Sequence, residues 1–186
     1  MFTGCNNQEV TVEKSGQVPA ADYQKDTVKT REAVSTESAE TAKEQQQRVD
    51  FGIKEKSWLT TNLRNASELK NEYWKKLIPK NKELMPIVLD EVFTAWMADT
   101  ALTKSDTDFV INSLGAAFGQ WLVDHYQMKW IVVTDANGTG YAVIHEKGNV
   151  IAYPPAAVKK AIDAEEEKFM FGVEMEIKDK LSKQAK

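Results

Sequence analysis

The sequence predicts an α+β fold: helices, then a three-stranded antiparallel meander, then one or more C-terminal helices. Apolar residues recur every three or four positions between Ser57 and Tyr126, which is the period of helices that pack on one side. From Trp130 to Tyr153 the pattern changes to short β-branched runs separated by turn residues, as in strands joined by hairpins. Pro154-Pro155 then ends the strand region and suits the first turn of another helix.

Composition indicates one globular domain with a polar segment in front of it. The chain has 186 residues, which is enough for one ordinary domain with some length to spare. Hydrophobic residues make up 42 %, and every aromatic residue except Phe2 and Tyr23 lies at or after Phe51. We therefore expect a disordered polar tether at 1–50, where too little apolar surface is available to offset the loss of chain entropy, and a single α+β domain at 51–186.

The charge balance argues against two classes of partner. The chain carries 24 Lys and Arg residues against 28 Asp and Glu residues, for a net charge of −4. Short basic groups alternate with acidic residues, so the sequence offers no clustered basic surface for a nucleic acid. No apolar run approaches the ~20 residues that a membrane-spanning helix needs.

The first five residues, Met-Phe-Thr-Gly-Cys, resemble the end of a bacterial lipoprotein signal, in which small residues precede the cysteine that receives the lipid. Thr3 and Gly4 fit that pattern, while Phe2 stands where Leu is usual. The basic and apolar regions of such a signal would lie upstream, which would make Met1 an internal residue of it. We therefore expect a cell-envelope protein that faces the periplasm and reaches the membrane only through a lipid anchor at Cys5; the alternative is a cytoplasmic protein.

Three helices are expected before the strands, with bounds of Ser57–Ile78, Pro86–Thr100 and about 105–126. Inside the third helix Gly115 and Gly119 lie one turn apart. Because glycine weakens a helix, two of them on one face indicate that another element packs closely there.

The three strands are expected at about 130–134, 141–146 and 150–153. Asn137-Gly138 is the strongest hairpin signal among the connections. The final segment, Phe169–Leu181, alternates as a strand would and also fits a helical stripe. We favour a helix there, because the surrounding Glu and Lys residues are good helix formers.

The order of these features resembles a known family. The residues that carry the resemblance are Leu114-Gly115, Gly119, Trp130–Asp135, Gly138-Thr139, Tyr141–Val143, Tyr153-Pro154 and Val158-Lys159. They resemble the bacterial family called domain of unknown function 3806, whose members have a helix with spaced glycines, a Trp-led strand, an acidic-Gly turn and a Pro after the third strand. The resemblance covers about Asp106 to Asp163, and it implies a fold and no activity.

No catalytic residues, metal site or cofactor are predicted. The chain has two histidines, of which His125 is expected to continue the buried stripe of the third helix. His145 falls near the end of the second strand, on the same face as Tyr141. Cys5 is the only cysteine, and two histidines without closely spaced acidic residues make a weak set of metal ligands.

A candidate ligand-binding set lies on the meander, and it consists of Trp130, Asp135, Tyr141 and His145. In the structural interpretation Trp130 belongs to the core, Asp135 caps a turn and Tyr141 packs across the strands. In the functional interpretation the four residues line a face that binds a protein segment or a small ligand.

These features favour a non-catalytic, lipid-anchored binding protein of undetermined oligomeric state. Two alternatives stay open. One is a small hydrolase with His145 as base and Asp135 or Glu146 nearby, and the other is a cytosolic interaction module, such as an immunity-type partner of a toxin.

Overall fold

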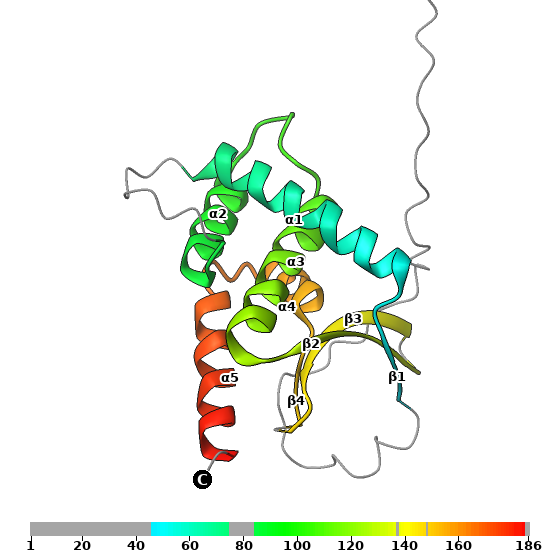
Figure 1. Cartoon of the computed structure of the whole chain (residues 1–186). Helices are drawn as coiled ribbons and strands as arrows, with labels where there is room; N and C mark the ends of the chain where they lie inside the picture. The colour runs from blue at the N-terminus through cyan, green and yellow to red at the C-terminus, as the bar shows by residue number, and fades with distance from the viewer. Residues whose placement is uncertain (1–45, 75–83, 137, 148, 185–186) are drawn as a thin grey trace, which may run out of the picture. The chain divides into compact units, whose positions relative to one another are not determined.

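A computed structural model describes residues 46–74, 84–136, 138–147 and 149–184 (Figure 1). All described elements belong to one compact unit, Ala39–Lys186. In chain order they are β1 (Gln47–Asp50), α1 (Ile53–Tyr73), α2 (Pro86–Ala98), α3 (Thr107–Tyr126), β2 (Lys129–Asp135), β3 (Gly138–His145), β4 (Val150–Ala152), α4 (Pro154–Asp163) and α5 (Met170–Gln184).

The α+β prediction is confirmed, with one correction to the sheet. The sheet has four antiparallel strands in the order β1-β2-β3-β4, not three. The additional strand, β1, lies before Phe51, in residues that the sequence assigned to the tether. It is an edge strand whose four side chains are all exposed, so it shows neither the apolar alternation nor the apolar run by which a strand is recognised.

The predicted helices are present with shifted ends. α1 begins at Ile53, four residues before the predicted start, and the Glu55 carboxylate accepts a hydrogen bond from the Gly52 amide at 3.0 Å. The predicted end of that helix, Ile78, lies outside the described residues. The C-terminal segment is a helix, as favoured. Met170 and Ile177 are buried while Phe171 and Met175 face solvent, which does not follow the alternation of a strand.

The main core lies between the helices and one face of the sheet. α3 is its central helix, and the side chains of Leu114, Phe118 and Leu122 on it are fully buried. The other four helices and the strands β2, β3 and β4 add apolar residues to the same cluster. Figure 1 shows the helices gathered on one side of the sheet, which leaves the other face turned away from them.

The two glycines of α3 allow the close packing that the sequence indicated. A Cβ at Gly115 would lie 2.6 Å from the Cα of Pro155, at the start of α4. A Cβ at Gly119 would overlap the six-membered ring of Trp130 on β2. α3 therefore packs against α4 and β2 at distances that no residue larger than glycine permits.

A buried carboxylate joins α2 to the start of α5. Asp90 is 3 % exposed, and its two oxygens accept hydrogen bonds from the amides of Phe169 (3.1 Å), Met170 (2.9 Å) and Phe171 (3.0 Å). The first amides of a helix have no partner within the helix, so Asp90 caps α5 from a distance of about 80 residues in the chain.

None of the helices within the described ranges is both long and apolar enough to span a membrane.

Candidate functional site

The two faces of the sheet carry different apolar clusters. Alternation along β3 places Tyr141 and Val143 on the face that packs against the helices. Ala142 and Ile144 point to the opposite face, where they join Ile131 and Val133 of β2. We call these four residues the outer cluster. Among the described residues, Ile151 of β4 and Tyr153, which follows β4, pack against this cluster.

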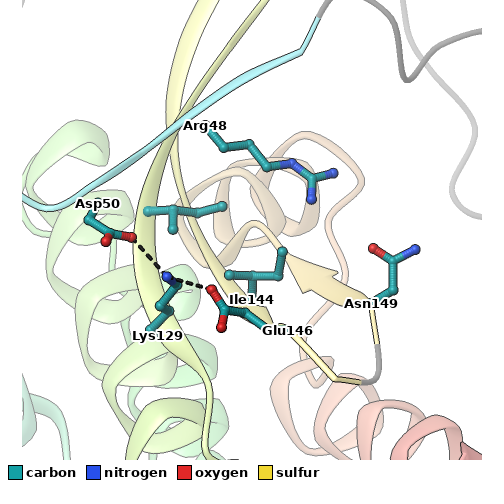
Figure 2. Close-up of a pocket in the computed structure, with 7 residues that line it drawn as sticks. Arg48, Asp50, Lys129, Ile144, Glu146 and Asn149 are labelled. Carbon is teal, nitrogen blue, oxygen red and sulfur yellow. Dashed lines mark ion pairs between the residues drawn. The ribbon is translucent and has the colours of Figure 1, made fainter.

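A hollow of about 430 Å³ opens on this outer face (Figure 2). Ile131 and Ile144 of the outer cluster form its apolar floor. The polar side chains around it come from three separate places in the chain, and they are Arg48, Asp50, Lys129, Glu146 and Asn149. The hollow therefore combines an apolar floor with charges of both signs.

Lys129 links two strands at one end of the hollow. Its amine lies 3.0 Å from Asp50 Oδ1 of β1 and 2.6 Å from Glu146 Oε1, just after β3. The hydrogen bond with Glu146, followed by that with Asp50, raises the pKa of Lys129 above its usual value. The amine is therefore charged at neutral pH, and it neutralises part of the charge of the two carboxylates that flank it.

Arg48 supplies the other cationic group, away from the Lys129 ion pairs in Figure 2. Its guanidinium donates to the uncharged amide oxygen of Gln46, at 3.1 Å from Nε and 2.8 Å from the terminal nitrogen. Gln46 in turn donates to the hydroxyl of Tyr153 at 2.9 Å, so this chain of bonds runs along the outer face. An anionic ligand group would find at Arg48 a planar set of donors suited to a carboxylate.

The structure brings together two of the four predicted ligand-binding residues. Trp130 and Tyr141 are joined by Phe51 and Trp58 in an aromatic cluster on the helix-facing side of the sheet. Phe51 stacks on Trp130 with ring centres 5.2 Å apart, and the ring centres of Trp58 and Tyr141 are 4.4 Å apart. Trp130 is only 8 % exposed, and its indole N–H donates to Gln120 at 3.1 Å, as expected of a core residue.

The other two predicted residues lie at opposite ends of β3's hairpin. Asp135 pairs with Gly138 at the tip, whereas His145 pairs with Val150 at the far end of β3. Seven residues of strand separate these positions, or about 23 Å. The hydrolase hypothesis placed Asp135 or Glu146 near His145. Asp135 is therefore remote from His145, whereas Glu146 follows it directly in the chain and is ion-paired with Lys129. His145 lines a second, smaller hollow of about 140 Å³, which shares Lys129 and Glu146 with the first.

His125 corrects a second expectation. The sequence placed it on the buried stripe of α3, but its side chain is exposed at the end of the helix. The imidazole stacks on Trp121 with ring centres 3.6 Å apart, and its Nδ1 lies 2.9 Å from the Trp121 carbonyl oxygen. The fully buried residues of α3 end at Leu122. Cys5 lies outside the described residues.

The side chains around the hollow are charged, amide and aliphatic groups. The side chains around the hollow include no cysteine, serine or histidine nucleophile, and the Lys129 amine is protonated. Across the residues that the structure describes, no three His, Cys, Asp or Glu side chains are grouped so that they could hold a metal ion.

The sequence indicated only part of this site. β2 and β3 form a hairpin in which Asp135 pairs with Gly138, and the sequence predicted a hairpin at this place, so the approach of Lys129 to the end of β3 was within reach of sequence reasoning. Arg48 and Asp50 could not, because β1 gives no strand signal and its position depends on long-range pairing with β2.

The comparisons with known proteins cover only part of this site, because the family match does not include Arg48 and Asp50. No curated protein and no solved structure matches the chain significantly. A family model does match residues 91–172, which run from within α2 through α3, the strands β2 to β4 and α4 to the start of α5. The match extends the stretch of resemblance, Asp106 to Asp163, on both sides. Residues 91–172 are thus similar to the family described as Domain of unknown function (DUF3806).

Proposed function

We propose that this is a non-catalytic binding protein, and that its ligand is an extended segment of a protein partner in which an acidic residue adjoins an apolar one. The observation that carries the proposal is the hollow on the outer face, where an apolar floor lies beside charged groups. Ile131 and Ile144 would contact the apolar side chain of the segment. Arg48 would pair with its carboxylate, because Asp50 and Glu146 already share the charge of Lys129.

The proposed ligand class can be tested with a random octapeptide library displayed on phage and selected on the immobilised full chain. Enriched peptides should contain an acidic residue next to an apolar one, and synthetic copies should bind in fluorescence anisotropy. Lys129→Met should weaken their binding at least about tenfold, because it leaves Asp50 and Glu146 facing the hollow without a cation. Lys178→Met is the matched control, since Lys178 is an exposed lysine of α5 and should leave binding unchanged.

Two results would contradict this function. One is a library in which no sequence is enriched over the uncoated support. The other is a set of enriched peptides that bind Lys129→Met as tightly as the parent chain.

We further propose that the protein is a lipoprotein anchored in the bacterial cell envelope through Cys5 and facing the periplasm. The support is the small-small-Cys pattern at Thr3-Gly4-Cys5 and the polar composition of the residues up to Asp50, which suits a spacer between a membrane and a domain.

The anchor has a direct test in cells. When the gene is expressed with its upstream codons, an alkyne analogue of palmitate should label the protein and the membrane fraction should contain it. Cys5→Ser should abolish both, because the thiol is the group that receives the lipid. An in-frame stop codon immediately before the Met1 codon would exclude the lipoprotein assignment.

A further inference from the structure

The outer edge of the sheet is formed by β1, whose four residues are all exposed. An edge strand presents backbone N–H and C=O groups that can pair with another strand. Two exposed large apolar residues belong to this part of the chain: Val49 within β1 is 52 % exposed, and Ile53, three residues after the strand, is 89 % exposed. Apolar exposure beside an edge strand is typical of a surface that is covered by a partner.

We propose that the partner is a second copy of this chain, whose β1 pairs with this β1 in antiparallel orientation to make one continuous sheet of two subunits. The pairing is self-complementary, as a two-fold interface requires. It goes beyond the binding of a peptide and does not rest on the hollow being occupied.

Charge selects the register of this pairing. We place the helices of both copies on the same side of the sheet, so residues that lie directly opposite across the two β1 strands must point to the same face. Arg48 and Asp50 share one face of β1, so each can lie opposite either Arg48 or Asp50 of the second copy. A register centred on Arg48 or on Asp50 would oppose like charges. A register centred on Val49 places Val49 opposite Val49 of the second copy, and Arg48 opposite Asp50 on both sides of the axis.

The four-residue sequence Gln-Arg-Val-Asp thus makes two opposite-charge pairs and one apolar pair with itself. A single short strand pair buries less area than a standard interface of ~1,600 Å². We therefore expect a reversible dimer with a Kd of about 10–100 μM. Because Arg48 and Asp50 also line the hollow, the dimer would set the hollows of the two copies side by side.

Sedimentation equilibrium of the full chain, run with reductant so that Cys5 cannot crosslink two copies, measures this dimer. Arg48→Asp places a carboxylate opposite Asp50 in both cross-strand pairs, and Asp50→Arg places a guanidinium group opposite Arg48 in both. Each variant alone should therefore dimerise at least about tenfold more weakly than the parent chain. Mixed one to one, the two variants should form a heterodimer of parental strength, since both charge pairs are then complementary again.

Lys129→Met should leave the dimer intact while it weakens peptide binding, which separates this inference from the proposed function. Thermal melts that match the parent chain would show that each variant is folded. The inference is overturned if the parent chain is monomeric at about 1 mM, if neither charge variant changes the dimer, or if the mixture stays monomeric.

Discussion

Gly119→Ala should lower the free energy of unfolding by about 3 kcal/mol, at the upper end of the usual cost of overpacking a core. The added methyl group would overlap two carbons of the Trp130 indole, which is itself held by Phe51 on one side and by a hydrogen bond to Gln120. The indole has little freedom to retreat, so either β2 or α3 must shift. Gly115→Ala should cost at least as much, because its methyl group meets the backbone of Pro155, which no side-chain rotation can move.

Gly172→Ala is the matched control, because Gly172 lies in α5 with no atom within 4 Å of an added Cβ. There the same substitution should stabilise the chain by up to about 1 kcal/mol, since alanine is the better helix former. Urea melts followed by circular dichroism give all three values. If Gly119→Ala were as stable as Gly172→Ala, the contact between α3 and Trp130 would have to be looser than described.

A second substitution identifies the contact that is responsible. Trp130→Phe removes the part of the ring that the new methyl group would meet. It should cost stability in the parent chain, where it leaves a cavity, and less in the Gly119→Ala background, where it relieves the overlap. A double-mutant cycle should therefore give a favourable interaction energy of about 1–2 kcal/mol.

The elements that the sequence predicted well are those whose signal is local. α3 has a long apolar stripe and an N-cap at Asp106, whose carboxylate accepts a hydrogen bond from the Phe109 amide at 2.7 Å. Its two glycines indicated a closely packed neighbour, and α4 and Trp130 are those neighbours. β2 and β3 are β-branched runs around a turn. The choice of helix for the last segment also rested on local propensity.

What the sequence could not show depends on contacts between distant residues. β1 exists because its backbone pairs with β2, more than 80 positions later, and its four exposed side chains form no apolar pattern that would predict a strand. The hollow could not be predicted for the same reason, because two of its lining residues, Arg48 and Asp50, belong to β1. His125 was misplaced because a helical stripe says which residues share a face and does not say where the neighbouring element ends.

Asp90→Ala should lower the free energy of unfolding by about 3 kcal/mol at neutral pH. The carboxylate accepts three backbone hydrogen bonds at the start of α5, and removing it leaves three amides without an acceptor in a partly buried place. The negative charge also lies at the positive end of the α5 dipole. Asp90→Asn keeps the shape and one acceptor oxygen but turns an N–H group toward the amides, so it should cost about 1–2 kcal/mol.

The pH dependence of this cost follows from the environment of Asp90. Burial raises the pKa of its carboxyl, against the opposing effect of the three amides and of Lys168. A carboxyl with a raised pKa in the folded state contributes most to stability below its unfolded pKa of about 3.9, and this contribution falls as pH rises through the folded value. The difference in stability between the parent chain and Asp90→Ala should therefore be larger at pH 4 than at pH 7.

Asp163→Ala serves as the control, because Asp163 is an exposed residue whose 2.6 Å pair with Lys159 lies on the surface of α4. Such a pair contributes less than about 1 kcal/mol, so this variant should melt close to the parent chain. Hydrogen exchange locates the effect of Asp90→Ala: the amides of Phe169, Met170 and Phe171 should exchange much faster, while those in the middle of α3 should follow global unfolding. If those three amides stayed protected in Asp90→Ala, the start of α5 would be held by its own packing against α2, and the cap would be secondary.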